Sequence, residues 1–140
     1  MSAVKSSNEN RLAMKIPGLH LTQISSGDFL LESSRALNIH DQDTLIRGLV
    51  ARLQHAKSTR LYYDLSEQVI IDPVYYAWLN KLARALLTIN IKMICIHMQP
   101  TAAFALAQFT QESPIFGTAL DISGWRKASD RGQHDQRRPD

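Results

Sequence analysis

The strongest constraint on the fold of this chain is the alternation of strand-like and helix-like segments along it. The strand-like segments are short and apolar, or alternate apolar with polar residues, and they cover residues 19–24, 29–31, 61–65, 89–97 and 117–122. The helix-like segments have apolar residues at helical spacing or a capping start, and they cover residues 41–54, 72–87, 100–109 and 123–125. This order predicts an α/β fold with a mixed, largely parallel sheet of four or five strands covered by helices.

Residues with known preferences for helix ends mark the helix starts. Asp41 stands where a carboxylate favours the positive end of a helix dipole. Asp72 and Pro73 are a typical N-cap and first helical residue, and Pro100 opens the next helix. The core face expected for the helix that begins at Pro73 comprises Val74, Ala77, Trp78, Leu82, Ala83 and Leu86.

Residues 89–97 (INIKMICIH) are nearly continuously apolar. Such a run is typical of a strand covered on both faces, so we expect it to be the central strand. Cys95 should then be a buried, inert thiol, and His97 should pack at the edge of the core. The apolar run 69–71 fits two structures, an extension of strand 61–65 or part of a loop.

Composition divides the chain into three parts. Residues 1–15 are polar and predict a flexible N-terminal segment, and residues 129–140 lack an apolar anchor and predict a disordered polar tail. The folded domain is expected over residues 16–128. The net charge of +3 comes from the two ends, because residues 16–125 carry slightly more acidic than basic side chains. A nucleic-acid partner needs a basic face on the fold itself and is therefore not expected.

The sequence carries no signal for a membrane or for secretion. No apolar run is long enough to span a bilayer or resembles a signal peptide. Cys95 is the single cysteine, which excludes an intramolecular disulfide. We therefore expect a cytoplasmic protein with no membrane partner.

Catalytic patterns are weak. The glycines are scattered singly, so there is no Gly-rich phosphate loop, and the histidines share no spacing typical of metal ligands. Asp64 and Asp72 could meet as a carboxylate pair, but we favour a strand-end acid and a helix cap. We expect no cofactor, no metal and no enzymatic activity. A small hydrolytic or ligand-binding α/β domain is the alternative from another functional class.

Two tyrosine doublets are candidates for a contact surface. They are Tyr62 with Tyr63, and Tyr75 with Tyr76. In each doublet we expect one ring to face the core, and an exposed second ring would mark an interface, where Tyr is enriched. Plain packing explains the doublets equally well. With Trp78 and Phe109 they would supply apolar area for self-association, so a homo-oligomer is expected.

The run from Tyr63 to Pro73 (YDLSEQVIIDP) resembles the STAS family of anti-sigma-factor antagonists and stressosome scaffold proteins. In that family a strand ending in hydrophobic-Asp-Leu-Ser/Thr-Gly leads to Asp-Ser or Asp-Thr and a long helix. The run from Met93 to Pro100 (MICIHMQP) is similar to the stressosome-type hydrophobic-Gly-Ile-Arg-Pro segment, and residues 118–122 are similar to the closing strand. The likeness covers residues 16–128 and implies the STAS fold.

The resemblance implies a regulatory protein-binding domain in stress or sigma-factor signalling. In the family, a serine kinase binds this surface and phosphorylates the hydroxyl after the Asp. Here that position is Pro73, the second family site is Ala105, and Glu67 replaces the motif glycine, so both usual phosphorylation positions lack a hydroxyl. The implied partners are a serine kinase or homologous STAS proteins. The implied docking residues are Asp64, Ser66, Glu67, Asp72, Pro73, Tyr75, Tyr76 and Thr101. A conventional antagonist phosphorylated at another hydroxyl, such as Ser66 or Thr101, is the closest alternative.

Overall fold

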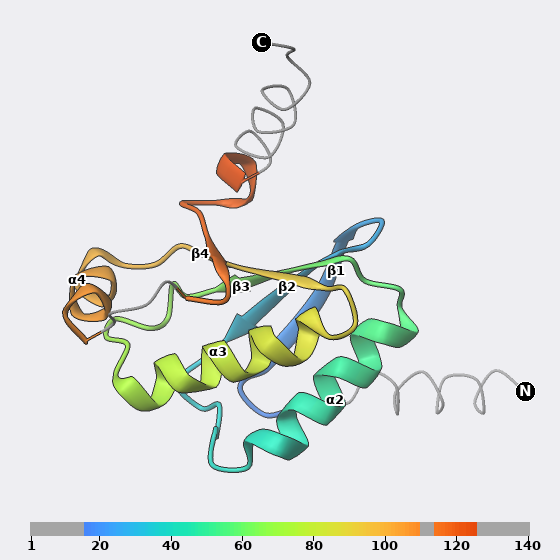
Figure 1. The fold of residues 1–140 in the computed structure, drawn as a ribbon, viewed down its shortest axis with the longest axis horizontal. Helices are drawn as coiled ribbons and strands as arrows, with labels where there is room; N and C mark the ends of the chain where they lie inside the picture. The colour runs from blue at the N-terminus through green and yellow to red at the C-terminus, as the bar shows by residue number, and fades with distance from the viewer. Residues whose placement is uncertain (1–15, 110–113, 126–140) are drawn as a thin grey trace, which may run out of the picture.

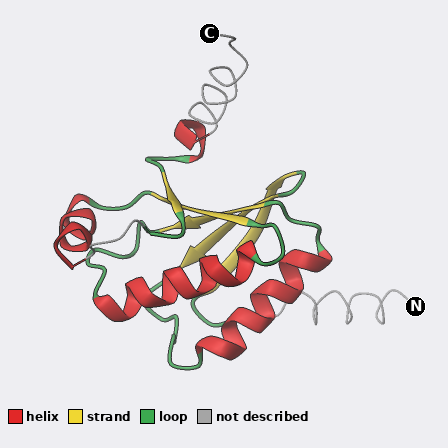
Figure 2. Ribbon diagram, viewed as in Figure 1, coloured by secondary structure: helices red, strands yellow, loops and turns green. Residues whose placement is uncertain are grey.

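The computed structural model describes residues 16–109 and 114–125, which form a five-stranded sheet with helices packed on it (Figures 1 and 2). The strand order is β1-β2-β3-β4-β5; β1 and β2 are antiparallel, and the other neighbours are parallel. The elements are β1 Leu19–Ser25, β2 Asp28–Ser33, α2 Gln42–His55, β3 Arg60–Asp64, α3 Pro73–Leu87, β4 Lys92–Ile96, α4 Pro100–Phe109 and β5 Gly117–Thr118. The predicted α/β fold with a largely parallel sheet is confirmed. The predictions for residues 1–15 and 129–140 concern residues outside the described ranges.

The helix starts follow the capping signals of the sequence. Asp41 precedes α2 and accepts a backbone N–H with its carboxylate. Asp72 precedes α3, and its Oδ1 accepts the N–H of Tyr75 at 2.7 Å. Pro73 is the first residue of α3, where the missing N–H leaves no helical hydrogen bond unmade. These starts, and that of α4 at Pro100, confirm the sequence predictions.

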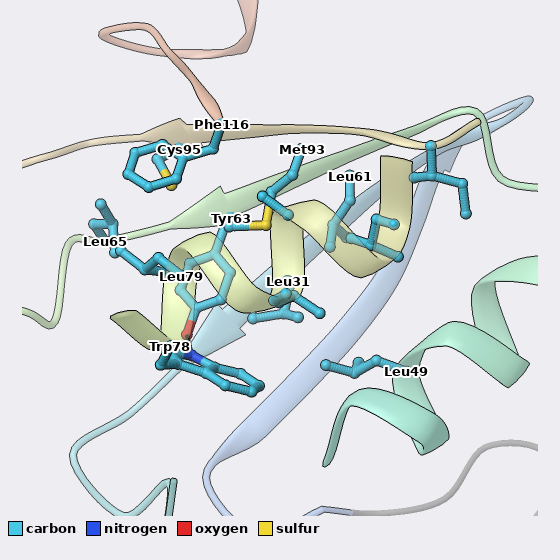
Figure 3. Close-up of a cluster of buried hydrophobic side chains, with 14 of the residues drawn as sticks. Leu31, Leu49, Leu61, Tyr63, Leu65, Trp78, Leu79, Met93, Cys95 and Phe116 are labelled. Carbon is cyan, nitrogen blue, oxygen red and sulfur yellow. Dashed lines mark hydrogen bonds between the residues drawn. The ribbon is translucent and has the colours of Figure 1, made fainter. Parts of the chain in front are cut away.

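Helices α2 and α3 lie side by side on one face of the sheet and bury the larger core cluster with it (Figure 1). In this cluster, Trp78 and Leu79 of α3 lie close to Tyr63 of β3, with Met93 and Cys95 of β4 in the same layer (Figure 3). Cys95 is fully buried as predicted, and burial raises the pKa of its thiol. The thiol therefore stays protonated and inert.

Strand β4 is covered on both faces, but it is not the central strand. Met93 and Cys95 face the larger cluster, whereas Ile94 and Ile96 face the opposite side of the sheet. The central position belongs to β3, the third of the five strands in the sheet order. Beyond β4 the sheet adds only β5, the two residues Gly117–Thr118, among the described residues. The strand also begins later than residue 89, since residues 88–91 close the end of α3 with a left-handed Asn90 at φ 63°.

The core face of α3 is shifted from the predicted one. Its buried residues are Trp78, Leu79, Leu82, Ala83 and Leu86. Val74 and Ala77 were expected on this face, but both are exposed, Val74 by 60%. Tyr75 of the same turn reaches Tyr63 of β3 with its hydroxyl, so the helix turns that side toward the sheet and leaves Val74 and Ala77 in solvent. Among the described residues, no helix combines the length and the apolar content needed to cross a membrane.

The tyrosine doublets do not supply an exposed ring. Tyr62 and Tyr63 are both fully buried, because successive residues of β3 face opposite sides of a sheet that is covered on both. Tyr75 and Tyr76 are half-buried. Plain packing, one of the two explanations left open, therefore accounts for the β3 doublet, and the fully buried Trp78 cannot contribute to self-association.

The second face of the sheet holds a smaller cluster. Tyr62 packs there with Ile94 and Ile96 under the segment that follows β5, and that segment contributes Ala119, Ile122 and Trp125. The Trp125 ring lies so close to Gly117 that a Cβ there would come within 3.0 Å of it. The Tyr62 hydroxyl is buried and has no hydrogen-bond partner among the described residues.

Candidate functional site

The candidate site lies at the end of the sheet where β3 and β4 run out, which we call the carboxyl edge (residues 64–76, 97–104 and 119–121). Parallel strands bring their carboxyl ends to one edge of a sheet, and ligands of open α/β sheets bind at this edge. Asp64 is the last residue of β3, and its Oδ1 accepts the Ser66 N–H at 2.8 Å. Eight residues later Asp72 caps α3. The structure thus brings the predicted acids and the helix start to one edge.

Three side-chain contacts join the loop after β3 to the loop after β4 and the start of α4. The imidazole Nδ1 of His97 lies 3.2 Å from Asp64 Oδ1. The Gln99 Nε2 donates to the Ser66 carbonyl at 2.7 Å, and the Thr101 hydroxyl donates to the Val69 carbonyl at 2.7 Å. These contacts hold residues 66–69 against the next loop. The run 69–71 is therefore part of this loop and does not extend β3.

His97 differs from its prediction as a packed residue at the core edge. Its side chain is 46% exposed, and its backbone has φ 58°, in the left-handed region that favours glycine. The stressosome-type motif that the sequence resembles has glycine at this position, and this chain makes the left-handed turn with histidine. Its N–H donates to the Leu120 carbonyl at 3.1 Å, which ties the turn to the segment after β5.

The two acids do not form a carboxylate pair. Asp64 contacts Ser66 and His97, whereas Asp72 accepts the N–H of Tyr75, so each carboxylate has its own partners. The simpler reading, a strand-end acid and a helix cap, describes both. Within the described residues no group of three or more His, Cys, Asp or Glu side chains could hold a metal ion.

A buried chain of hydrogen bonds lies beneath the start of α3. The Trp78 Nε1 donates to the Tyr63 hydroxyl at 3.1 Å, that hydroxyl pairs with the Tyr75 hydroxyl at 2.6 Å, and Tyr75 reaches Ser33 Oγ at 3.1 Å. Burial raises the pKa of Tyr75 and raises that of Tyr63 well above its ordinary value. The chain connects β2, β3 and α3, so it fixes the first turn of α3 to the sheet.

The remaining predicted positions divide between surface and interior. Pro73 and Glu67 are exposed, and Glu67 borders a hollow of about 480 Å³ formed with residues of β1 and β2. Tyr76 packs edge-to-face on Phe116, with ring centroids 6.1 Å apart. Ala105, at the second family phosphorylation position, is half-buried.

The sequence patterns missed the exposed apolar side chains of the carboxyl edge. Ile70 is 68% exposed, and Phe104 on α4 is 69% exposed. The full set comprises Val69, Ile70, Val74, Phe104 and Leu120. Periodicity assigns apolar residues of a helix or strand to the core. It gives their spacing but does not say which of them meet another element in the folded chain.

Comparison with known sequences gives no relative. No protein-family model matches the chain, and no curated protein matches it.

Comparison with solved structures gives clear neighbours. A variant of RsbS from Moorella thermoacetica superposes with a TM-score of 0.63 at 14% identity, over 82% of this chain and 97% of that one. A chain of the stressosome, described as a signal integration and transduction hub, gives 0.65 at 14% identity over 81% and 99%. The anti-sigma factor antagonist SpoIIAA in its unphosphorylated form gives 0.51 at 12% identity over 82% and 97%. These neighbours are STAS-domain proteins, and the chain described here has the STAS fold that its motifs implied.

Proposed function

We propose that this chain is a non-catalytic regulatory domain that acts in the cytoplasm by binding other proteins. Its role would be that of a scaffold or an anti-sigma-factor-antagonist-type partner in stress or sigma-factor signalling. Its partners would be a serine kinase or homologous STAS proteins, with assembly into a homo-oligomer. The docking surface is the carboxyl edge, and its residues include Asp64, Ser66, Glu67, Asp72, Pro73, Tyr75, Tyr76 and Thr101.

The observation that carries the proposal is the set of three contacts from His97, Gln99 and Thr101 to the loop after β3. In the family that the motifs resemble, a phosphate on the residue after the Asp changes this surface. Here Pro73 cannot accept a phosphate, yet the loop beside it is already held in one shape. A surface held by its own side-chain contacts suits a partner that docks constitutively. The structural likeness to RsbS, the stressosome chain and SpoIIAA supports the regulatory class.

The intact mass of the protein isolated from its own cells, before and after stress, tests the unphosphorylated state. We expect one mass, without added phosphate, in both conditions. Pro73→Ser restores an acceptor hydroxyl at a helix N-terminus, where free N–H groups stabilise a phosphate, and its mass should rise when a partner kinase is present. Stoichiometric phosphate on Ser66 or Thr101 of the unaltered protein would instead favour the conventional phospho-switched antagonist.

Cross-linking in the native cell tests the docking surface itself. A photo-crosslinking residue replaces Ile70 at the carboxyl edge or, as the matched control, Leu87, which is exposed at the end of α3. We expect a kinase or another STAS-type protein to be captured from position 70 only. Capture of the same proteins from both positions, or of none from position 70, would contradict the proposed docking surface.

A further inference from the structure

The carboxyl edge has an uneven charge that the net charge of the chain conceals. No Lys or Arg occurs between Leu61 and Asn80, or between Met93 and Trp125. The acids of these two stretches within the described residues are Asp64, Glu67, Asp72 and Asp121. Glu32, opposite Asp64 in the register of β2 and β3, adds a further acid, against Arg35 just after β2. The carboxyl edge is therefore acidic although the whole chain carries +3.

The opposite edge of the sheet collects the basic side chains. Arg52 lies in the last turn of α2 and Arg84 in the last turn of α3. Lys57, Arg60 and Lys92 lie at or just before the starts of β3 and β4. The acid facing them is Asp28, which pairs with Arg60 at 3.5 Å. The two edges thus differ in sign.

Helix capping accounts for part of this polarity but not for all of it. Asp72 lies at the start of α3, where it offsets the positive end of the helix dipole. Glu67 lies in the loop, five residues before that cap, and its side chain is exposed. Its charge therefore remains available to a partner.

Most of the large hydrophobic side chains exposed on the described residues share this acidic edge. They are Val69, Ile70, Val74, Phe104 and Leu120, whereas Ile24 and Leu87 lie elsewhere. Thr101 and Gln99 bond the carbonyls of Val69 and Ser66, which ties the loop that carries Val69 and Ile70 to the start of α4. Exposed apolar side chains among polar ones mark interaction sites.

On the basis of the proposed function, we propose that the carboxyl edge binds a protein surface in which Lys or Arg side chains surround aliphatic or aromatic ones. The apolar set supplies the buried area, and Glu67 with the neighbouring acids selects a basic rim. The same edge of a second copy is excluded as the partner, because like charges would face each other across the interface.

Two model peptides and the isotope-labelled full chain test the chemistry of this surface by NMR. One peptide is an amphipathic Lys/Leu sequence, and the other has Glu in place of every Lys. We expect the Lys/Leu peptide to shift amides of residues 65–76 and 98–104 with an affinity that falls as salt rises, and the Glu/Leu peptide to leave them unchanged. Equal binding of both peptides, shifts centred on the opposite edge, or no binding of the Lys/Leu peptide would overturn the assignment.

Matched variants separate charge from apolar area. Glu67→Gln should weaken the Lys/Leu peptide by about three- to fivefold, the effect of one exposed charge at contact distance. Asp43→Asn also removes one acid, but Asp43 lies on α2, outside the residues of the carboxyl edge, so it should have less than half this effect. Phe104→Ser should weaken binding by about tenfold or more, whereas Leu87→Ser should leave it unchanged.

The outcome also distinguishes this inference from the proposed function. If native partners cross-link from position 70 but the Lys/Leu peptide does not bind, the docking surface stands and its assigned chemistry is wrong. If the peptide binds there and no native partner is captured, the surface chemistry stands and the regulatory role is wrong.

Discussion

His97 Nδ1 lies 3.2 Å from Asp64 Oδ1, so a histidine in the left-handed conformation meets the acid at the end of the neighbouring parallel strand. The contact joins two loops that are far apart in sequence. It also places a bulky residue where the backbone favours glycine. The cost of that conformation and the benefit of the contact can be measured separately.

We expect His97→Gly to be more stable than His97→Ala by about 1 kcal/mol in urea unfolding, because only glycine relieves the left-handed backbone. Both variants lose the contact with Asp64, which is partly exposed and contributes at most about 1 kcal/mol. The glycine variant should therefore remain close to the unaltered protein. Equal stability of the two variants would mean that the backbone at residue 97 is not strained.

Thr101→Val should loosen the loop after β3 with little change in global stability. The lost hydroxyl-to-carbonyl bond contributes about 1 kcal/mol, so amide exchange in residues 66–71 should rise about fivefold. Thr88→Val removes a similar bond, to the Ala85 carbonyl at the far end of α3, and serves as the control. If both variants change exchange in residues 66–71 equally, Thr101 does not hold the loop.

Tyr62→Phe and Tyr63→Phe should affect stability in opposite ways. The Tyr62 hydroxyl is buried without a partner among the described residues, so removing it should be neutral or stabilising by about 1 kcal/mol. The Tyr63 hydroxyl contacts both Trp78 and Tyr75, so its removal should destabilise the fold by about 1–3 kcal/mol. Thermal and urea unfolding of the two variants decide the matter. A large loss in Tyr62→Phe would reveal a partner for that hydroxyl.

Alkaline pH should destabilise the protein through Tyr63 and Tyr75. Burial raises both pKa values in the folded chain, so the unfolded chain releases these protons first as the pH rises. The stabilisation is complete below the unfolded tyrosine pKa of about 10 and is lost progressively above it. Absorbance at 295 nm should show these tyrosines ionising later in the native than in the denatured protein. Tyr75→Phe should reduce the alkaline loss, and an unchanged profile would contradict this assignment.

The elements could be predicted from sequence because their signals are local. Asp72 with Pro73 favours a helix start whatever the rest of the fold, and the apolar run ending at Ile96 is typical of a buried parallel strand. The central position of β3 was missed because strand order depends on pairing between distant segments. The exposure of Val74 was missed for a related reason, since the sequence does not say which side of α3 is turned toward the sheet.

The candidate site was predicted in part. Asp64, Ser66, Asp72 and Thr101 lie at one edge of the sheet, as the motif order implied, and their role in docking stays a prediction. His97 was assigned to the core edge because a histidine after an apolar strand gives no sign of a left-handed turn. The glycine of the family motif at that position was the available signal.

The joined loops have a consequence for the speed of docking. A partner that meets a flexible loop must wait for it to fold, and this appears as a slow, concentration-independent phase. Here Gln99 and Thr101 already hold residues 66–69 in place, so association should be a single step. Its rate constant should fall within about 10⁵–10⁷ M⁻¹s⁻¹, the range for docking two formed surfaces, and rise at low salt with a basic partner. The stability of the complex would then be determined almost entirely by how slowly the partner leaves.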